Sequence, residues 1–388
     1  MLPKITEKFQ ALTLMTWIIS SYVVASTALQ PIYGKLCHIY GHQYVLLVAH
    51  AFFLAGSVVC GASKSAHMLI AGRTIAGVGG SGLLSICFVV VGDFIPTARS
   101  PLYLSVFGMM WAIASVVGPL LGGVFADKTG FEWGFYINPC IQGIVIVLIV
   151  LFMRIPRPQG SATSKLKRID FIGIFAIVAG IVLLELALTW GGQDHPWKSA
   201  AVIVPLILGI LILGVFVLIE WKIAKEPVMP LRLFKRRNTR LMFVAQIFFG
   251  MSFFMPIFYF PLYLSNSVDQ QDIATTTTLF MTIRMLGNAI GLAIAQSVLQ
   301  NEISPLLKVI AAQFPDQANV VFGIVSDQSV IWKTGVPEDV RSSVIDAYVK
   351  SLQKVYLVFL AFGGLTFIVS LFAKNLKLRK NLGGAAAE

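Results

Sequence analysis

About ten apolar stretches of roughly 20 residues, the length that a helix needs to cross a bilayer, follow one another along the chain. Hydrophobic residues make up 57% of the sequence and charged residues only 12%, which excludes an ordinary soluble domain. The sequence therefore predicts an all-α polytopic membrane protein whose surroundings are a lipid bilayer. The predicted spans are residues 12–33, 44–62, 68–91, 102–125, 135–153, 171–190, 200–221, 241–264, 273–299 and 355–373.

The net charge of +12 is distributed unevenly between the spans. Lysine and arginine concentrate in residues 154–168, 222–240 and 374–380, and they are scarce in the intervening short loops. Basic short loops mark the cytoplasmic side of a membrane protein. Topology thus accounts for the charge, and we expect no nucleic-acid partner.

Two longer polar segments separate groups of spans. Residues 154–170 contain prolines and a glycine, and they are predicted to form a basic cytoplasmic linker. Residues 301–354 mix Asp, Lys, Gln and Pro, which predicts an aqueous loop with room for one amphipathic helix.

A glycine-proline motif interrupts the apolar span 102–125 and consists of Gly118, Pro119, Gly122 and Gly123. Proline lacks a backbone N–H, so it kinks a helix, and a bilayer tolerates such a break where neighbouring helices satisfy the freed carbonyls. The glycines leave a flat surface that another helix can approach closely. The motif predicts a kinked, close-packed helix in a protein that moves.

Three charged residues fall inside predicted spans, where charges are costly and usually functional. Arg73 faces a partner or a water-filled cavity, or else it lies near a helix end and its guanidinium reaches the membrane interface. Glu185 lies deeper, and it is either a protonatable coupling site or a carboxyl kept neutral by burial. Arg284 precedes Gly287 and Gly291, whose spacing favours close helix packing, so it is a coupling residue or the cap of a packing seam.

Other motifs carry less chemistry. The glycine-rich run 77–82 resembles a phosphate-binding loop, but it lies within one apolar segment rather than between a strand and a helix, so helix packing is favoured. His38 and His42 have the spacing of metal ligands on a helix, yet no acidic residue stands nearby. The four cysteines are predicted to be apolar packing residues. We expect no enzyme activity, no cofactor and no metal site.

Together these motifs resemble those of the fourteen-helix drug:proton antiporter branch of the major facilitator superfamily, especially fungal toxin and multidrug efflux pumps. The resemblance covers nearly the whole chain, and its segments are residues 17–22, 30–36, Arg73 with Gly77 and Gly79, the motif at Gly118–Gly123, and residues 135–139, 188–192, 196–197 and 284–291.

The resemblance implies a major facilitator fold in which two helix bundles rock around a central cavity. Residues 1–153 would be the N-terminal bundle, 154–170 the linker, 171–221 an extra helix pair, and 222–388 a truncated C-terminal bundle that contains the polar loop 301–354.

The implied function is proton-coupled efflux of a small amphiphilic organic compound by a monomer in the plasma membrane. Arg73, Glu185 and Arg284 would take part in proton coupling, and the loop with Gly34, His38 and Gly41 would control the conformational change. Vacuolar transport of basic amino acids, siderophore transport and a non-transporting remnant remain as alternatives.

The chain also departs from the family pattern. His38 stands where aspartate is usual, and His42 and Gln43 replace two basic residues, so the loop should latch the helices weakly or in a pH-sensitive way. Glu132 occupies a position where arginine is common. The resemblance implies that the first family helix and about three helices before the thirteenth have no counterpart in this sequence. Residues 273–299 would then run inward, which would leave the basic residues 374–380 outside, against the positive-inside preference.

Overall fold

The computed structural model describes residues 5, 8, 9, 14–96, 99–153, 155, 158, 169–192, 194–224, 226–252, 272–323 and 336–372. Within these residues the fold is helical, with a single isolated bridge between Gly191 and His195. The helices are α2 (Met15–Tyr40), α3 (His42–Gly61), α4 (Ala66–Phe94), α5 (Ser100–Lys128), α6 (Trp133–Phe152), α8 (Phe171–Trp190), α9 (Ala200–Lys222), η2 (Leu231–Lys235), α10 (Arg237–Ser252), α12 (Ile273–Gln313), η4 (Pro315–Gln317), α13 (Ala318–Gly323) and α14 (Glu338–Leu371).

The predicted all-α membrane fold is confirmed. Eight of the described helices are long and apolar enough to cross a membrane, namely α3, α4, α5, α6, α8, α9, α12 and α14. The predicted spans 12–33 and 241–264 correspond to α2, which carries more Ser, Thr and Gln, and to α10, whose described part ends at Ser252. The basic linker 154–170 and the basic residues 374–380 lie almost entirely outside the described residues.

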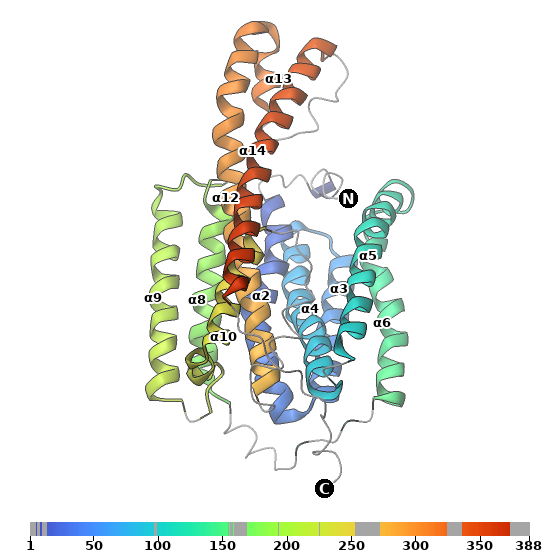
Figure 1. The fold of residues 1–388 in the computed structure, drawn as a ribbon. Coiled ribbons are helices and arrows are strands. Elements are labelled where there is room, and N and C mark those ends of the chain that lie inside the picture. The colour runs from blue at the N-terminus through green and yellow to red at the C-terminus, as the bar shows by residue number, and fades with distance from the viewer. Residues whose placement is uncertain are drawn as a thin grey trace.

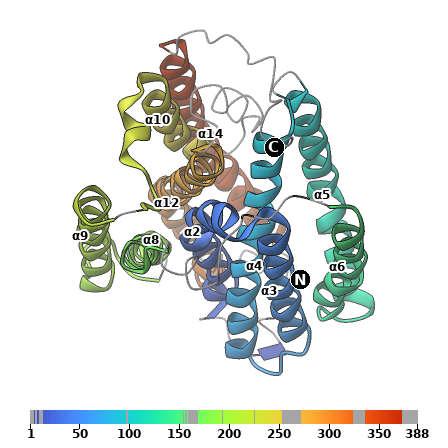
Figure 2. The same ribbon diagram turned by 90° about the horizontal axis from the view of Figure 1, so that it is seen from below.

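The long helices stand side by side, with α2, α4 and α12 in the middle, α9 at one edge, and α5 with α6 at the other (Figures 1 and 2). In the most apolar window of α4 and of α12, 56% of the residues are buried, against 6% in α5 and none in α6. The centre of the fold is therefore the contact of α12 with α2 and α4.

Glycines of α4 allow the closest of these contacts. A Cβ at Gly77 would meet the carbonyl oxygen of Tyr22 in α2, and one at Gly79 would meet the backbone of Ala49 and Phe53 in α3. The glycine-rich run thus packs against two helices at once, as small residues do in membrane proteins. This confirms the helix-packing interpretation of residues 77–82.

The seam between α10 and α12 fixes the direction in which α12 runs. A Cβ at Gly287 would meet Ile247, and one at Gly291 would meet Met251, so the contact moves four residues forward on both helices. The two helices are therefore parallel, and the predicted close packing of these glycines is confirmed. Arg232 of η2 donates to Asp272 at 2.7 Å, which places the start of α12 beside η2.

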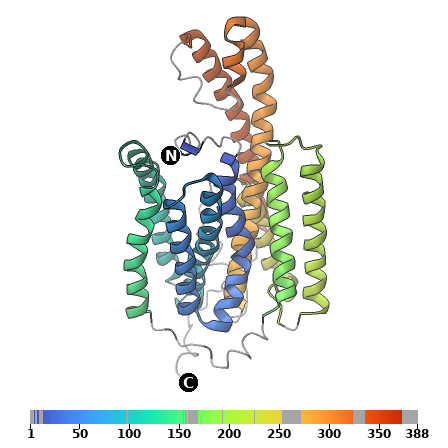
Figure 3. The same cartoon turned by 180° about the vertical axis from the view of Figure 1, so that it is seen from behind.

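The predicted inward direction of residues 273–299 is consequently wrong. The helix α12, which contains residues 273–299, begins at the end of the helix layer that carries η2 and runs away from it. The helix α14 runs antiparallel to α12, back toward that same end (Figures 1 and 3). The prediction failed because it assumed that residues 273–299 run antiparallel to the preceding span, whereas α12 runs parallel to α10. The expected conflict with the positive-inside preference does not arise from the described helices.

The segment 301–354, predicted as an aqueous loop, contains the ends of two long helices. The helix α12 continues to Gln313, and α14 begins at Glu338, so that together they project beyond the other helices (Figure 3). The contact between them is apolar and repeats at heptad spacing, as in a coiled coil. Its buried residues are Ile303, Leu307, Ile310 and Ala311 of α12 with Val340, Val344 and Ala347 of α14, and Val321 of α13 completes the cluster.

This arrangement predicts opposite accessibility for two lysines. With Cys87 and Cys140 replaced by alanine, Lys308→Cys should react with a membrane-impermeant maleimide in intact cells, because Lys308 lies on the projecting part of α12. Lys235→Cys in η2 should react only after permeabilisation. Labelling of both cysteines from the same side would contradict the direction of α12.

Candidate functional site

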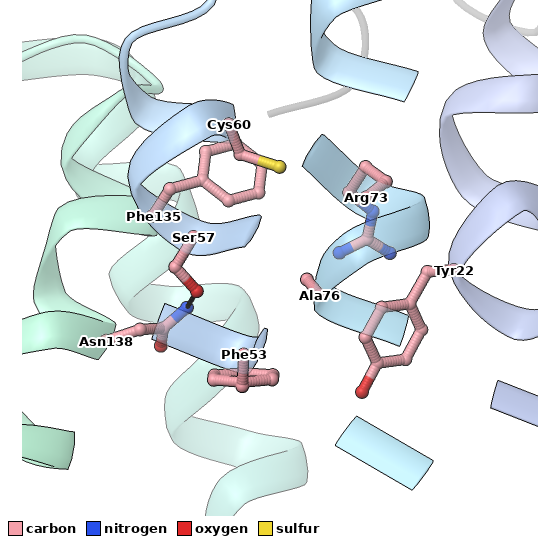
Figure 4. Close-up of a pocket in the computed structure, with 8 residues that line it drawn as sticks. All are labelled: Tyr22, Phe53, Ser57, Cys60, Arg73, Ala76, Phe135 and Asn138. Atoms are coloured by element: carbon pink, nitrogen blue, oxygen red, sulfur yellow. Dashed lines mark hydrogen bonds between the residues drawn. The ribbon is translucent and has the colours of Figure 1, made fainter. Parts of the chain in front are cut away.

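Arg73 of α4 lines a cavity of about 120 Å³ between α2, α3, α4 and α6. Figure 4 shows its guanidinium between the Tyr22 ring and the α3 side of the cavity. The structure thus favours the cavity interpretation of Arg73 over an arginine that reaches the membrane interface. The other lining residues are Tyr22, Phe53, Ser57, Cys60, Ala76, Phe135 and Asn138.

Two contacts hold the Arg73 side chain. Its Nε donates to the carbonyl oxygen of Ile18 at 3.2 Å, and its guanidinium carbon lies 4.6 Å from the centre of the Tyr22 ring. Among the described residues, no carboxylate lies within ion-pair distance of Arg73. The positive charge is therefore stabilised by a carbonyl dipole and an aromatic ring rather than by a neutralising charge.

Polar side chains attach α6 to α3 on the far side of the cavity. The Asn138 amide donates to the Ser57 hydroxyl at 3.2 Å, and the Gln43 amide donates to the carbonyl oxygen of Ile149 at 3.3 Å. His50 also hydrogen-bonds Gln142. Sequence reasoning missed this seam, although Gln43, His50 and Ser57 recur every seventh residue on α3, which is a detectable signal.

Glu185 and Arg284 are both buried, but neither lines the Arg73 cavity. Glu185 of α8 is 2% exposed and faces Thr27 of α2, and its Oε1 has no hydrogen-bond partner among the described residues. Arg284 of α12 is 7% exposed, and its Nε likewise lacks a partner there. The three predicted charged residues therefore do not share one site.

The segment predicted as a loop is helical except at Gly41, because Gly34 and His38 belong to the last turns of α2 and α3 begins at His42, at the end of the layer that carries η2. Gly34 approaches α12 so closely that a Cβ would lie 2.9 Å from the carbonyl oxygen of Ala274. Gly41 separates α2 from α3 with a φ of 91°, which favours glycine. The Nε2 of His38 is buried and has no hydrogen-bond partner among the described residues.

Two ion pairs connect this loop to other elements. His42 Nε2 lies 2.9 Å from an Asp93 carboxylate oxygen of α4, and Lys35 Nζ lies 3.0 Å from Glu226, ahead of η2. His42 therefore occupies the position of a charge partner although a more basic residue is usual there. The pair between His42 and Asp93 is ionic only while the imidazole is protonated.

We predict that His42→Ala weakens the contact between the start of α3 and the end of α4, because it removes the side chain that pairs with Asp93. A largely buried carboxylate that loses its hydrogen-bond partner costs stability, so the variant should melt at least about 2 °C below the wild type. Fluorescence-detected melting of the purified proteins measures the difference. An unchanged melting temperature would show that this pair does not stabilise the fold.

The glycine-proline motif of α5 is not close-packed, which corrects the expectation. A Cβ at Gly118 or Gly123 would meet no atom within 4 Å, and Pro119 is exposed. The reason is that α5 touches α4 near its own N-terminal end, where Leu104 is buried beside Phe88. The rest of α5 diverges from α4, so the flat surface faces outward.

A second cavity, of about 210 Å³, lies between α8, α12 and the segment that joins α8 to α9. Trp197 donates its indole N–H to Ser297 at 3.1 Å, and the ring covers Gly191. The lining residues are Leu188, Trp197, Ile290, Ala293, Ile294, Ser297, Val298 and Asn301.

The described residues contain no group of three or more His, Cys, Asp or Glu side chains that could hold a metal ion. The cysteines are free, with Cys37 and Cys60 buried and Cys87 and Cys140 exposed.

Comparison with known proteins identifies the family. A family model described as Major Facilitator Superfamily matches residues 1–313. The chain belongs to this superfamily. It is a multi-pass membrane protein of a transporter family rather than an enzyme, as predicted.

The relatives of this chain include fungal efflux pumps, which confirms the predicted resemblance. The chain is 37% identical over 283 residues to the MFS-type efflux pump LUC4 of a Fusarium species. This alignment covers 72% of the chain and 50% of LUC4. It is 28% identical over 478 residues to the efflux pump FUS6 of Gibberella fujikuroi, covering 98% of this chain and 86% of FUS6. The matched part thus spans about half the length of LUC4.

The FUS6 alignment of 478 residues is longer than the chain of 388 residues, so it includes FUS6 segments without a counterpart here. An internal gap of the predicted kind would produce this excess. Among solved structures, the human organic anion transporter MFSD10 (TETRAN) is 14% identical, with a TM-score of 0.43 over 75% of this chain and 79% of that chain.

Proposed function

We propose that the protein exports small amphiphilic organic compounds across the plasma membrane as a monomer and couples export to proton entry. The observation that carries the proposal is the cavity around Arg73, in which a half-buried cation lies inside the helix bundle of a chain similar to fungal efflux pumps. The similarity to efflux pumps supports the direction of transport, and the cation in the cavity supports the coupling.

Arg73 would act through its charge. A guanidinium without a described counter-charge repels a proton that enters the cavity, so it favours proton release after the proton has crossed the membrane. Tyr22 and the Ile18 carbonyl hold the guanidinium in place, which keeps this effect directed at the cavity rather than at the lipid.

Glu185 would be the proton-accepting group. Its carboxyl is buried between α8 and α2 and has an oxygen with no described hydrogen-bond partner, so it can exist there either protonated or charged with a small rearrangement. Protonation would remove the free-energy cost of the buried charge and weaken the contact of Glu185 on α8 with Thr27 on α2. Arg284 would take a supporting part by stabilising the seam between α10 and α12.

The glycine-proline motif would act in another conformation. The open surface around Gly118 gives α5 room to move against a neighbouring helix, and the absence of side chains there would let such a contact form. The loop with Gly34, His38 and Gly41 would hold the resting state through the pairs of Lys35 and His42.

Transport can be tested in inverted membrane vesicles with the fluorescent amphiphile rhodamine 6G. Vesicles that contain the protein should accumulate the probe when their lumen is acidified, and a protonophore should release it, whereas vesicles without the protein should not. Accumulation that survives the protonophore would contradict proton coupling. No accumulation of this or other amphiphilic probes would favour a non-transporting remnant, and accumulation in isolated vacuoles alone would move the site to the vacuolar membrane.

A further inference from the structure

The second cavity lies at the outer end of the helix layer and shares no lining residue with the Arg73 cavity. The segment that joins α8 to α9 is at the end of the layer from which α12 projects (Figures 1 and 3). Along α12, which begins at Ile273, the lining residues Ile290 and Asn301 lie about 26 Å and about 42 Å from the start. The hydrocarbon core of a bilayer is about 30 Å thick, so the cavity begins in the outer leaflet and ends among the headgroups.

Trp197 gives this cavity a fixed aromatic wall. Its indole N–H donates to Ser297 at 3.1 Å, and a Cβ at Gly191 would lie 2.5 Å from its ring. The end of α8 is held as well, because the ring of Trp190 packs edge-on against Trp17 of α2, with the ring centres 5.8 Å apart. These contacts position the wall before any ligand enters, as is usual in sites for small molecules.

The described lining is largely aliphatic, and its polar groups lie toward the outer end. Ser297 already accepts from Trp197 and donates to the carbonyl oxygen of Ala293 at 2.9 Å. The amide of Asn301, one turn farther out on α12, has no hydrogen-bond partner among the described residues. No charged side chain is among the described lining residues, whose aliphatic members are Leu188, Ile290, Ala293, Ile294 and Val298.

We propose that the second cavity binds a compact neutral amphiphile that has one or two apolar rings and a hydroxyl or carbonyl group. The volume of about 210 Å³ equals that of about seven water molecules in the liquid, which limits the ligand to this size. The uncharged lining offers nothing to compensate a desolvated charge, which excludes ions.

The position of the cavity also sets the orientation of the ligand. The rings would lie in the outer leaflet between Ile294 and the face of Trp197, where an aromatic pair adds to the area buried. The polar group would hydrogen-bond the Asn301 amide at the level of the headgroups. This inference does not depend on the proposed transport activity, because it concerns binding to the outer side of the chain at equilibrium.

The test is photolabelling of the purified full chain in detergent with a benzyl alcohol that carries a trifluoromethyl diazirine. Light releases N₂ from the diazirine, the resulting carbene inserts into a nearby bond of the protein, and peptide mass spectrometry locates it. The label should lie on Trp197 or on residues 290–301 of α12. Excess 1-naphthol should remove it, whereas naphthalene-1-sulfonate, which has the same rings and a negative charge, should not.

Two tryptophan variants of α12 test the cavity itself. Ile294→Trp fills the cavity and should lose most of the label. Leu292→Trp is the matched control, because Leu292 is 60% exposed and does not line the cavity, so this variant should keep the label. Size-exclusion chromatography checks that both variants remain monodisperse.

Asn301→Leu tests the polar contact at an exposed position, where the fold should tolerate it. The variant should weaken competition by 1-naphthol at least about threefold, the effect of one lost hydrogen bond, and should leave competition by naphthalene unchanged. If Ile294→Trp is not monodisperse, this result decides alone.

Three results would overturn the proposal. One is a label that 1-naphthol does not remove from the lining residues, and another is equal labelling of the two tryptophan variants. Equal competition by the sulfonate would contradict a neutral ligand. Displacement by phosphatidylcholine as effectively as by 1-naphthol would overturn it too, since the cavity would then hold a lipid acyl chain.

Discussion

Arg73→Ala is expected to abolish proton-driven accumulation of rhodamine 6G in inverted vesicles and to leave the amount of protein in the membrane unchanged. The reason is that, among the described residues, Arg73 supplies the charge that lines the cavity of α2, α3, α4 and α6. Removing a half-buried cation that has no described carboxylate partner leaves no orphaned anion among the described residues, so the fold should survive. The measurement is the initial rate of probe uptake at equal protein amounts.

The Arg73→Lys variant tests whether charge alone is sufficient. A lysine ammonium keeps the charge but cannot reproduce the planar guanidinium that lies on Tyr22 and donates to Ile18, so uptake should recover only partly. Lys64→Ala, at the exposed turn before α4, is the matched control and should transport normally. Undiminished proton-driven uptake by Arg73→Ala would remove Arg73 from the coupling mechanism.

The Gly79→Val substitution is expected to prevent correct assembly of the membrane helices. The added side chain would collide with the α3 backbone at Ala49 and Phe53, which cannot move aside as a flexible side chain could. We expect a destabilisation of at least about 3 kcal/mol, since overpacking against backbone exceeds ordinary core strain. Size-exclusion chromatography of the solubilised protein should show loss of the monodisperse species.

Gly118→Val is the matched control for Gly79→Val, because it makes the same substitution at an open position. No atom lies within 4 Å of a Cβ at Gly118, so this variant should remain monodisperse and melt close to the wild-type temperature. If transport nevertheless falls, α5 uses this surface in another conformation. Equal destabilisation by both valines would show that the open position of α5 is not the one the protein adopts in the membrane.

Hydropathy was sufficient to predict the membrane helices. A segment in lipid must satisfy its own backbone hydrogen bonds as a helix, and its side chains must be apolar, so each span is a long apolar run in the sequence. The projecting ends of α12 and α14 escaped the same analysis. Their residues mix charged and apolar side chains, which averages to a polar segment. The signal lay in spacing instead, with Ile303, Leu307 and Ile310 facing Val340 and Val344 at heptad intervals.

The candidate site was predicted only in part. Arg73 could be singled out because a charge within a span is rare and costly. Its neighbours Tyr22 and Asn138 could not, since they come from helices whose contacts depend on the whole packing arrangement. The motif at Gly118 failed for the same reason, because a flat helix surface specifies what can approach it but not whether a helix does.

The length of α12 means that a small tilt of this helix produces a large displacement at its projecting end. With 41 residues at 1.5 Å each, α12 is about 60 Å long. It begins beside η2 and continues past the other helices, where α14 packs against it. A tilt of one degree about its inner end would therefore swing the outer tip by about 1 Å. Small tilts of α12 within the bilayer would therefore produce larger displacements at its projecting end. A probe attached at Lys308 would report these displacements.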